Sequence, residues 1–210
     1  MSAHKPYGPY ERFIKRPQDF LCALLALVVL SPVLAVTALL VRLKLGAPVL
    51  FTQERPGRDG KIFRLYKFRT MLPPTPGLDD PVHDAQRLTP FGRKLRATSL
   101  DELPELFNIL KGDMAVVGPR PLLTQYLSRY SARQARRHEV RPGFTGLAQV
   151  HGRNAISWAE KFEWDVRYVD HVTFLGDWKI IFETVKTVLK HEGISGGDTA
   201  TMTEFMGNES

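Results

Sequence analysis

The stretch Thr98-Ser99-Leu100-Asp101-Glu102-Leu103-Pro104-Glu105-Leu106 places two adjacent carboxylates beside a predicted helix start. Ser99 is a suitable N-cap, and Glu102 stands three residues later, where a capping box would place it. Pro104 is tolerated only in the first turn, because an interior proline removes a backbone hydrogen bond. We therefore expect a helix that begins near Ser99–Glu102, whose macrodipole keeps the pKa of Asp101 low. An isolated Asp-Glu pair at a helix start carries no chemistry by itself, so its role depends on the rest of the chain.

The composition limits the classes of protein to consider. A chain of 210 residues suffices for one domain with its own core. The net charge of +7 favours an anionic partner, which could be a nucleic acid, a phosphorylated substrate or an acidic membrane surface. A single cysteine, Cys22, excludes a disulfide framework and a cysteine metal site, and it fits a reducing compartment.

Residues 20–41 form a nearly uncharged apolar run that is just long enough to cross a bilayer as one helix. Ser31-Pro32 falls in the middle, where proline favours a bend and the Ser31 hydroxyl can cover a freed carbonyl. Basic residues flank both ends, so the positive-inside rule places both ends on the cytoplasmic face. We therefore predict a re-entrant helix, with a single span and a cleaved signal peptide as the alternatives. The flanking cations are Arg12, Lys15, Arg16, Arg42 and Lys44.

Two β segments are predicted at residues 47–53 and 61–69, separated by a turn-rich stretch at 55–60. In a regular strand Lys67 and Arg69 share one face and are spaced to hold phosphate oxygens. The alternative is an edge strand that its basic residues protect from further pairing.

Helices are predicted at residues 89–97, 122–138, 158–170 and 178–189. The first is short and amphipathic, and could lie at the headgroup boundary with its cations outward or be an ordinary surface helix. In the third, Asp165 shares a stripe with apolar residues. A carboxylate in that position is costly unless a cation or a metal pairs with it.

Three arginines are candidates for binding phosphate. Arg120 stands between Pro119 and Pro121, which restricts the backbone and presents a guanidinium suited to bidentate phosphate binding. Residues 140–154 form a glycine-rich loop whose backbone can approach a ligand closely, and Arg141 and Arg153 could bracket that ligand.

Together these stretches resemble the small monotopic phosphoglycosyl transferases, the bacterial sugar transferase family, and especially its PglC-like members. The likeness covers nearly the whole chain. The matching stretches are Ser31-Pro32, Phe51-Thr52-Gln53, Tyr66-Lys67-Phe68-Arg69-Thr70-Met71, Ser99 to Leu103, Lys111-Gly112-Asp113-Met114, Gly118 to Pro121, and Arg141 to Asn154.

The resemblance implies an α/β (α+β) catalytic domain on the cytoplasmic leaflet of the bacterial inner membrane, with a re-entrant N-terminal helix and surface amphipathic helices. It also implies transfer of a phospho-sugar from a UDP-sugar to polyprenol (undecaprenyl) phosphate, with Mg2+ as cofactor and no nucleic-acid partner. Asp101 is then the nucleophile and Glu102 its partner, and both are candidate metal ligands. The positions that match further active-site residues of the family are Lys67, Arg96, Arg120, Arg153 and Asp165.

The resulting division of the chain is a membrane segment at 1–45, a catalytic domain at 46–192 and an irregular tail at 193–210. The sugar favoured by the resemblance is an N-acetylated hexosamine such as diacetylbacillosamine. One alternative is a magnesium-dependent membrane phosphatase or pyrophosphatase with water as acceptor. Another is a non-enzymatic protein that binds anionic lipid or nucleic acid, although the basic residues are dispersed and form no single recognition helix.

Overall fold

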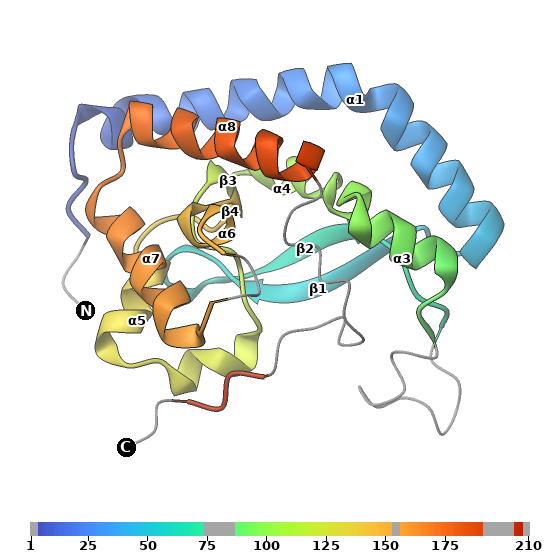
Figure 1. The fold of residues 1–210 in the computed structure, drawn as a ribbon. Helices are drawn as coiled ribbons and strands as arrows, with labels where there is room; N and C mark the ends of the chain where they lie inside the picture. The colour runs from blue at the N-terminus through green and yellow to red at the C-terminus, as the bar shows by residue number, and fades with distance from the viewer. Residues whose placement is uncertain (1–3, 74–86, 153–155, 191–203, 208–210) are drawn as a thin grey trace.

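The computed structural model describes residues 4–73, 87–152, 156–190 and 204–207. It confirms the predicted α+β class: helices surround two small sheets, and one long helix lies across them (Figure 1). Short 3-10 or π turns carry the label η. The elements are η1 (Tyr10–Ile14), α1 (Lys15–Leu45), β1 (Leu50–Pro56), η2 (Arg58–Gly60), β2 (Ile62–Phe68), α3 (Pro90–Ala97), η4 (Leu100–Glu102), α4 (Glu105–Lys111), β3 (Ala115–Val117), η5 (Thr124–Arg129), α5 (Ala132–Ala135), η6 (Arg136–His138), β4 (Gly143–Thr145), α6 (Leu147–Val150), α7 (Trp158–Asp170) and α8 (Phe174–Lys190).

The apolar run forms α1, a helix of 31 residues that continues through Pro32. In Figure 1 it runs along the top of the view and turns downward about half-way along. Pro32 cannot donate a hydrogen bond to the carbonyl of Val28, four residues earlier. The Ser31 hydroxyl donates to that carbonyl at 2.8 Å, which confirms the predicted way of covering it.

Both halves of α1 pack against the same body. In the first half, Ala23 is fully buried in a cluster with Ile109 and Met114. In the second half, Val41 is buried together with Phe68. The opposite face of the helix stays exposed and apolar, and among the described residues α1 with η1 is the one helix long and apolar enough to cross a membrane. Its exposed large side chains include Leu21, Leu24, Leu25, Val28, Val29, Val33, Val36, Leu39 and Leu43.

The predicted pair of strands is confirmed as an antiparallel hairpin, in which Leu50 pairs with Phe68 and Pro56 with Ile62. A second, parallel sheet of β3 and β4 was not predicted. Its glycines let the two backbones approach closely. A Cβ atom at Gly143 would lie 2.0 Å from the Gly118 nitrogen, so only glycine lets the two backbones come this close.

The predicted helix at 122–138 is wrong as a single element, since the structure divides it into η5, α5 and η6. Tyr130 is extended, and Ser131 begins a new helix with a capping box to Gln134. Two neighbouring predictions are confirmed: α7 covers 158–170, and α3 starts at Pro90 with the Thr89 hydroxyl accepting from the Gly92 N–H at 3.0 Å. The last helix, α8, begins four residues earlier than predicted, at Phe174.

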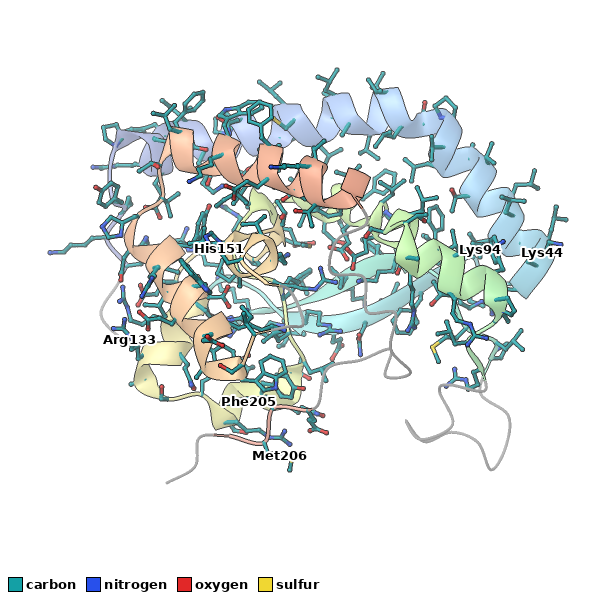
Figure 2. All side chains as sticks on the ribbon, viewed as in Figure 1. Lys44, Lys94, Arg133, His151, Phe205 and Met206 are labelled. Carbon is teal, nitrogen blue, oxygen red and sulfur yellow. The ribbon has the colours of Figure 1, made fainter. Side chains whose placement is uncertain are left out.

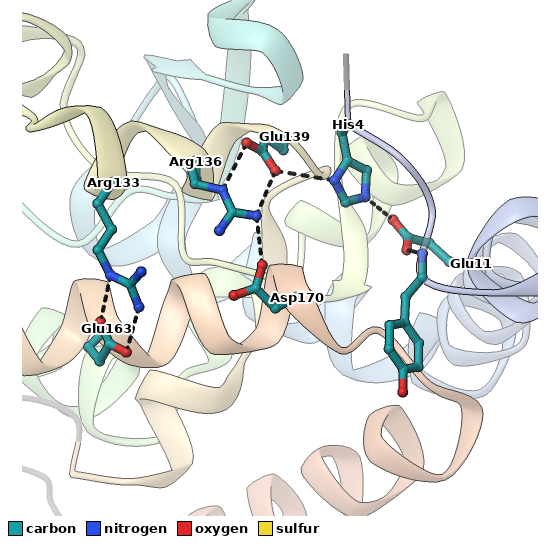
Figure 3. A network of polar contacts seen from close by, with 8 residues as sticks. His4, Glu11, Arg133, Arg136, Glu139, Glu163 and Asp170 are labelled. Carbon is teal, nitrogen blue, oxygen red and sulfur yellow. Dashed lines mark hydrogen bonds and ion pairs between the residues drawn. The ribbon is translucent and has the colours of Figure 1, made fainter. Parts of the chain in front are cut away.

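A polar network ties the N-terminal segment to η6 and α7 (Figure 3). His4 lies 2.6 Å from the Glu11 carboxylate and 3.2 Å from that of Glu139. Arg136 donates to Glu139 and to Asp170, the latter at 2.6 Å. The segment before α1 is therefore held against the body.

Replacing Pro32 with Ala should straighten α1, because residue 32 then has an N–H that can donate to the Val28 carbonyl and no ring that clashes with it. Spin labels at Leu25→Cys and Leu43→Cys in a Cys22→Ser background would measure the separation across the bend. In the Pro32→Ala protein it should rise toward roughly 27 Å, the length of 18 residues of straight helix.

The matched control is Ser31→Ala, which removes only the hydroxyl and should leave the separation unchanged. If Pro32→Ala also leaves it unchanged, the packing of the two halves on the body, and not the proline, imposes the bend.

Candidate active site

The carboxylate pair lies in η4 and not in the first turn of an α-helix. Ser99 has a left-handed conformation, with φ 55°, and caps nothing, while α4 begins only at Glu105 with Pro104 at its N-cap. The predicted capping box is therefore wrong. Its acid, Glu102, does not turn back to the Ser99 N–H because two cations from other segments bind its carboxylate.

Glu102 joins two parts of the chain that carry positive charge. Lys67 on β2 donates to its Oε1 at 2.7 Å, and Arg120, which follows β3, donates to the same oxygen. Burial raises the pKa of Glu102, but Arg120 and Lys67 outweigh it and hold that pKa well below its usual range. Among the described residues, Oε2 has no hydrogen-bond or ion-pair partner.

Asp101 is 7 % exposed and, within the part of the chain that the structure describes, its carboxylate has no hydrogen-bond or ion-pair partner. Burial and the neighbouring charge of Glu102 raise its pKa to about 6, against the attraction of Lys67, Arg96 and Arg120. The predicted low pKa is thus wrong, because burial and the charge of Glu102 outweigh the attraction of the neighbouring cations. Among the described residues, Asp101 is therefore a carboxylate without a hydrogen-bond or ion-pair partner, and three cations act to lower its pKa.

The charged cluster around Asp101 consists of Asp101, Glu102, Lys67, Arg96 and Arg120, together with Glu105 and Arg55, which the sequence pattern did not indicate. Glu105 is 2 % exposed and lies 3.2 Å from Lys67, and burial together with the charge of Glu102 raises its pKa. Arg55, at the end of β1, donates to Gln53 at 2.6 Å, while burial and Arg120 lower its pKa to about 10. Glu105 stands in the decisive stretch itself, but only the packing of α4 against β2 directs it toward Lys67.

The backbone of Arg120 is held by a buried ion pair. Arg137 donates to the Arg120 carbonyl at 2.7 Å and to the Asp165 carboxylate at 2.8 and 3.0 Å. The side chains of Arg137 and Asp165 are only 2 % and 4 % exposed. This confirms that Asp165 needs a cation, and it gives Asp165 the role of holding the segment that presents Arg120.

Two of the predicted phosphate-binding arginines, Arg69 and Arg141, donate to backbone carbonyls at helix ends. Arg69 donates to the carbonyls of Leu45 and Ala47 at the end of α1, because β2 ends at Phe68 and the alternation with Lys67 stops there. We therefore assign Arg69 to closing that helix end.

Arg141 donates to the Gly112 carbonyl at 2.9 Å, at the end of α4, so it also lies against a helix terminus. Arg96 donates to the Thr70 hydroxyl at 3.0 Å and is one of the cations that lower the pKa of Asp101. Arg153, the remaining candidate, lies outside the described residues.

The side-chain oxygens of the site show whether a metal ion could bind there. In the described ranges, no group of three or more His, Cys, Asp or Glu side chains is arranged to hold one. Within the described part of the chain, the Asp101 carboxylate and Oε2 of Glu102 are without hydrogen-bond or ion-pair partners. A pair of carboxylates fits Mg2+, which keeps several waters and completes its shell with substrate phosphates.

Comparison with known proteins places the chain among sugar transferases. A family model described as "Bacterial sugar transferase" matches residues 10–191. The chain is 51 % identical over 195 residues to "Uncharacterized sugar transferase EpsL" of Bacillus subtilis, covering 93 % of this chain and 96 % of that protein.

Other relatives have more specific names. The "Undecaprenyl-phosphate galactose phosphotransferase" of Salmonella typhimurium is 38 % identical over 199 residues, which cover 87 % of this chain and 42 % of that protein. The "UDP-glucose:undecaprenyl-phosphate glucose-1-phosphate transferase" of Caulobacter vibrioides is 40 % identical over 201 residues, covering 88 % and 74 %. The chain therefore spans less than half the length of the Salmonella relative and nearly all of the Bacillus one.

Asp165→Asn should lower the free energy of unfolding by about 3–5 kcal/mol, because it leaves the buried Arg137 without its counter-ion. The control is Glu163→Gln, which breaks the exposed pair with Arg133 in Figure 3 and should cost less than about 1 kcal/mol. Denaturant unfolding measures both values. Equal values for the two variants would show that the buried pair does not hold the segment.

Proposed function

The chain belongs to the bacterial sugar transferase family, and on that basis we propose that it transfers a phospho-sugar from a UDP-sugar to undecaprenyl phosphate and releases UMP. The observation that carries the proposal is the Asp101 carboxylate, which has no partner among the described residues and lies among cations. A carboxylate without such a partner can attack without first breaking an ion pair, while the donor's diphosphate requires positive charge around it.

In the first step, an oxygen of Asp101 attacks the sugar-bearing phosphorus of the donor. The bond between that phosphorus and the bridging oxygen breaks, and UMP leaves with the electron pair. The phospho-sugar is then an acyl phosphate on Asp101. In the second step, a phosphate oxygen of the lipid acceptor attacks the same phosphorus, which frees the Asp101 carboxylate and forms the diphosphate-linked lipid sugar.

The surrounding side chains bind and neutralise the donor. Glu102 fixes the Lys67 ammonium and the Arg120 guanidinium through one oxygen, so that both cations face the same region. Phosphoryl transfer depends mainly on such positioning and charge stabilisation. We propose that Asp101 and Glu102 Oε2 hold Mg2+, which supplies further charge neutralisation to the donor phosphates when bound.

The exposed face of α1 supports a monotopic arrangement at the inner membrane, with the catalytic domain, residues 46–192, on the cytoplasmic face. Because both halves of α1 pack on one body, the two ends of the helix lie on the same side of the bilayer in this arrangement. The bend then brings α1 into one leaflet and back, with the flanking cations at headgroup level. α8 adds a second apolar surface, with Leu175, Phe182 and Val185 exposed. The acceptor's phosphate would meet Asp101 at this height.

We further propose an N-acetylated hexosamine, such as diacetylbacillosamine, as the sugar of the donor. This choice follows the PglC-like pattern of the sequence, while the names of relatives refer to galactose, to glucose and to N-acetylgalactosamine. The pocket that selects the sugar therefore has to be tested directly with several donors.

Asp101→Asn should abolish turnover and the covalent adduct, because an amide oxygen is a poor nucleophile. Intact-mass measurement after mixing with donor should show the mass of one phospho-sugar on the native protein and none on the variant. The control is Asp113→Asn, whose carboxylate accepts from Asn108 and lies outside the cluster. Turnover without any donor-dependent mass gain on the native protein would remove the covalent mechanism.

UMP release across a panel of UDP-sugars, with and without undecaprenyl phosphate, should identify the donor and the reaction class. We expect turnover to require the lipid and to be fastest with an N-acetylated hexosamine. Steady release of sugar phosphate without lipid would instead support a phosphatase or pyrophosphatase. No turnover with any donor, together with lipid or nucleic-acid binding, would support the non-enzymatic alternative.

A further inference from the structure

The end of the chain returns to the body of the domain. Phe205 is 4 % exposed although it stands five residues from the C-terminus, whereas its neighbour Met206 is 77 % exposed. Figure 2 shows Phe205 beneath α7, among other side chains, and Met206 pointing away from the body. The contrast between these two adjacent apolar side chains indicates that Phe205 occupies a specific site on the body.

The site is a cage of aromatic rings from η5, from α7 and from Tyr130, which lies between η5 and α5. The Phe205 ring lies 4.9 Å from that of Phe162 and 5.9 Å from that of Tyr130, which it stacks on. The rings of Tyr126 and Trp158 are each 5.7 Å away. Edge-to-face and offset pairs at these distances are attractive beyond the area they bury.

Polar contacts fix the backbone on either side of the ring. The Phe205 N–H donates to the Tyr126 hydroxyl at 3.3 Å, and the Phe205 carbonyl accepts from Arg129. The preceding Glu204 accepts from Arg129 at 2.7 Å and from Gln125 at 2.6 Å. The segment is therefore held by its main chain, by a charge and by an aromatic side chain.

Two rings of the cage also face the cation that holds Arg120. The Arg137 guanidinium lies 5.8 Å from the Tyr130 ring centre and 5.7 Å from that of Phe162. Phe205 thus packs against the same two rings that flank Arg137. Because Arg137 donates to the Arg120 carbonyl, a path of direct contacts leads from Phe205 to Arg120.

We propose that Phe205 is a positioning residue for Arg120. Its ring keeps Tyr130 and Phe162 against Arg137, and Arg137 in turn holds the backbone from which Arg120 reaches the active site. The Arg120 side chain is 41 % exposed, so apart from its ion pair with Glu102 its position depends on that backbone more than on surrounding packing. This inference rests on the proposed function of Arg120 as a ligand of the donor phosphates.

The test compares Phe205→Ala with Met206→Ala, two apolar truncations at adjacent positions, in the full chain in lipid nanodiscs. Phe205→Ala should lower kcat/KM for the UDP-sugar about tenfold, mainly through KM, while Met206→Ala should stay within twofold. Phe205→Leu should recover part of the loss, and a peptide of residues 203–207 added to Phe205→Ala should restore donor affinity.

A double-mutant cycle with Arg120→Lys then separates positioning from a general effect on the fold. If Phe205 acts through Arg120, Phe205→Ala should cause little further loss in the Arg120→Lys background. The inference is overturned if the two substitutions lower kcat/KM independently, so that their losses multiply in the double variant. It is also overturned if the Phe205→Ala enzyme is as active as the native chain, or more active. An Arg120→Lys enzyme with native kinetics would instead count against the proposed function of Arg120.

Discussion

The site depends on one shared oxygen, Oε1 of Glu102, which binds Lys67 and Arg120 together. This carboxylate is largely buried, so it can remain charged only because two cations surround it. The same contacts bring a strand, a 3-10 turn and the proline-flanked segment after β3 to one place. Asp101, the preceding residue in the chain, has no hydrogen-bond or ion-pair partner among the described residues, and the positive charges of Lys67, Arg96 and Arg120 act on it.

Around this centre, other charges act mainly through the backbone. The buried pair of Arg137 and Asp165 holds the carbonyl of Arg120. Arg69 and Arg141 bind carbonyls at the ends of α1 and α4. Their guanidinium groups satisfy helix-end acceptors that would otherwise be unpaired. Several arginines near the site therefore stabilise the backbone around it.

The long helix α1 packs against the body along its whole length and also exposes an apolar face. One face of α1 supplies buried residues to two core clusters, and the other exposes an apolar surface along the helix. The Ser31 hydroxyl donates a hydrogen bond to the Val28 carbonyl, so the helix bends without leaving that carbonyl unsatisfied. An unsatisfied carbonyl costs most where no water is present. This geometry matches the proposed reaction, whose acceptor is a lipid phosphate at headgroup height.

The sequence by itself determined the local elements: the hairpin, the capped helices α3 and α7, the bend at Ser31-Pro32 and the requirement of Asp165 for a cation. Each of these follows from residues within a few positions of one another. Only the tertiary structure decided that Glu102 pairs with Lys67, 35 positions away, and with Arg120, 18 positions away. The tertiary structure also decided that the pKa of Asp101 is raised, that Glu105 lies next to Lys67 and that β3 pairs in parallel with β4. Charge and burial act through space, and a linear pattern shows which residues are charged but not which of them meet.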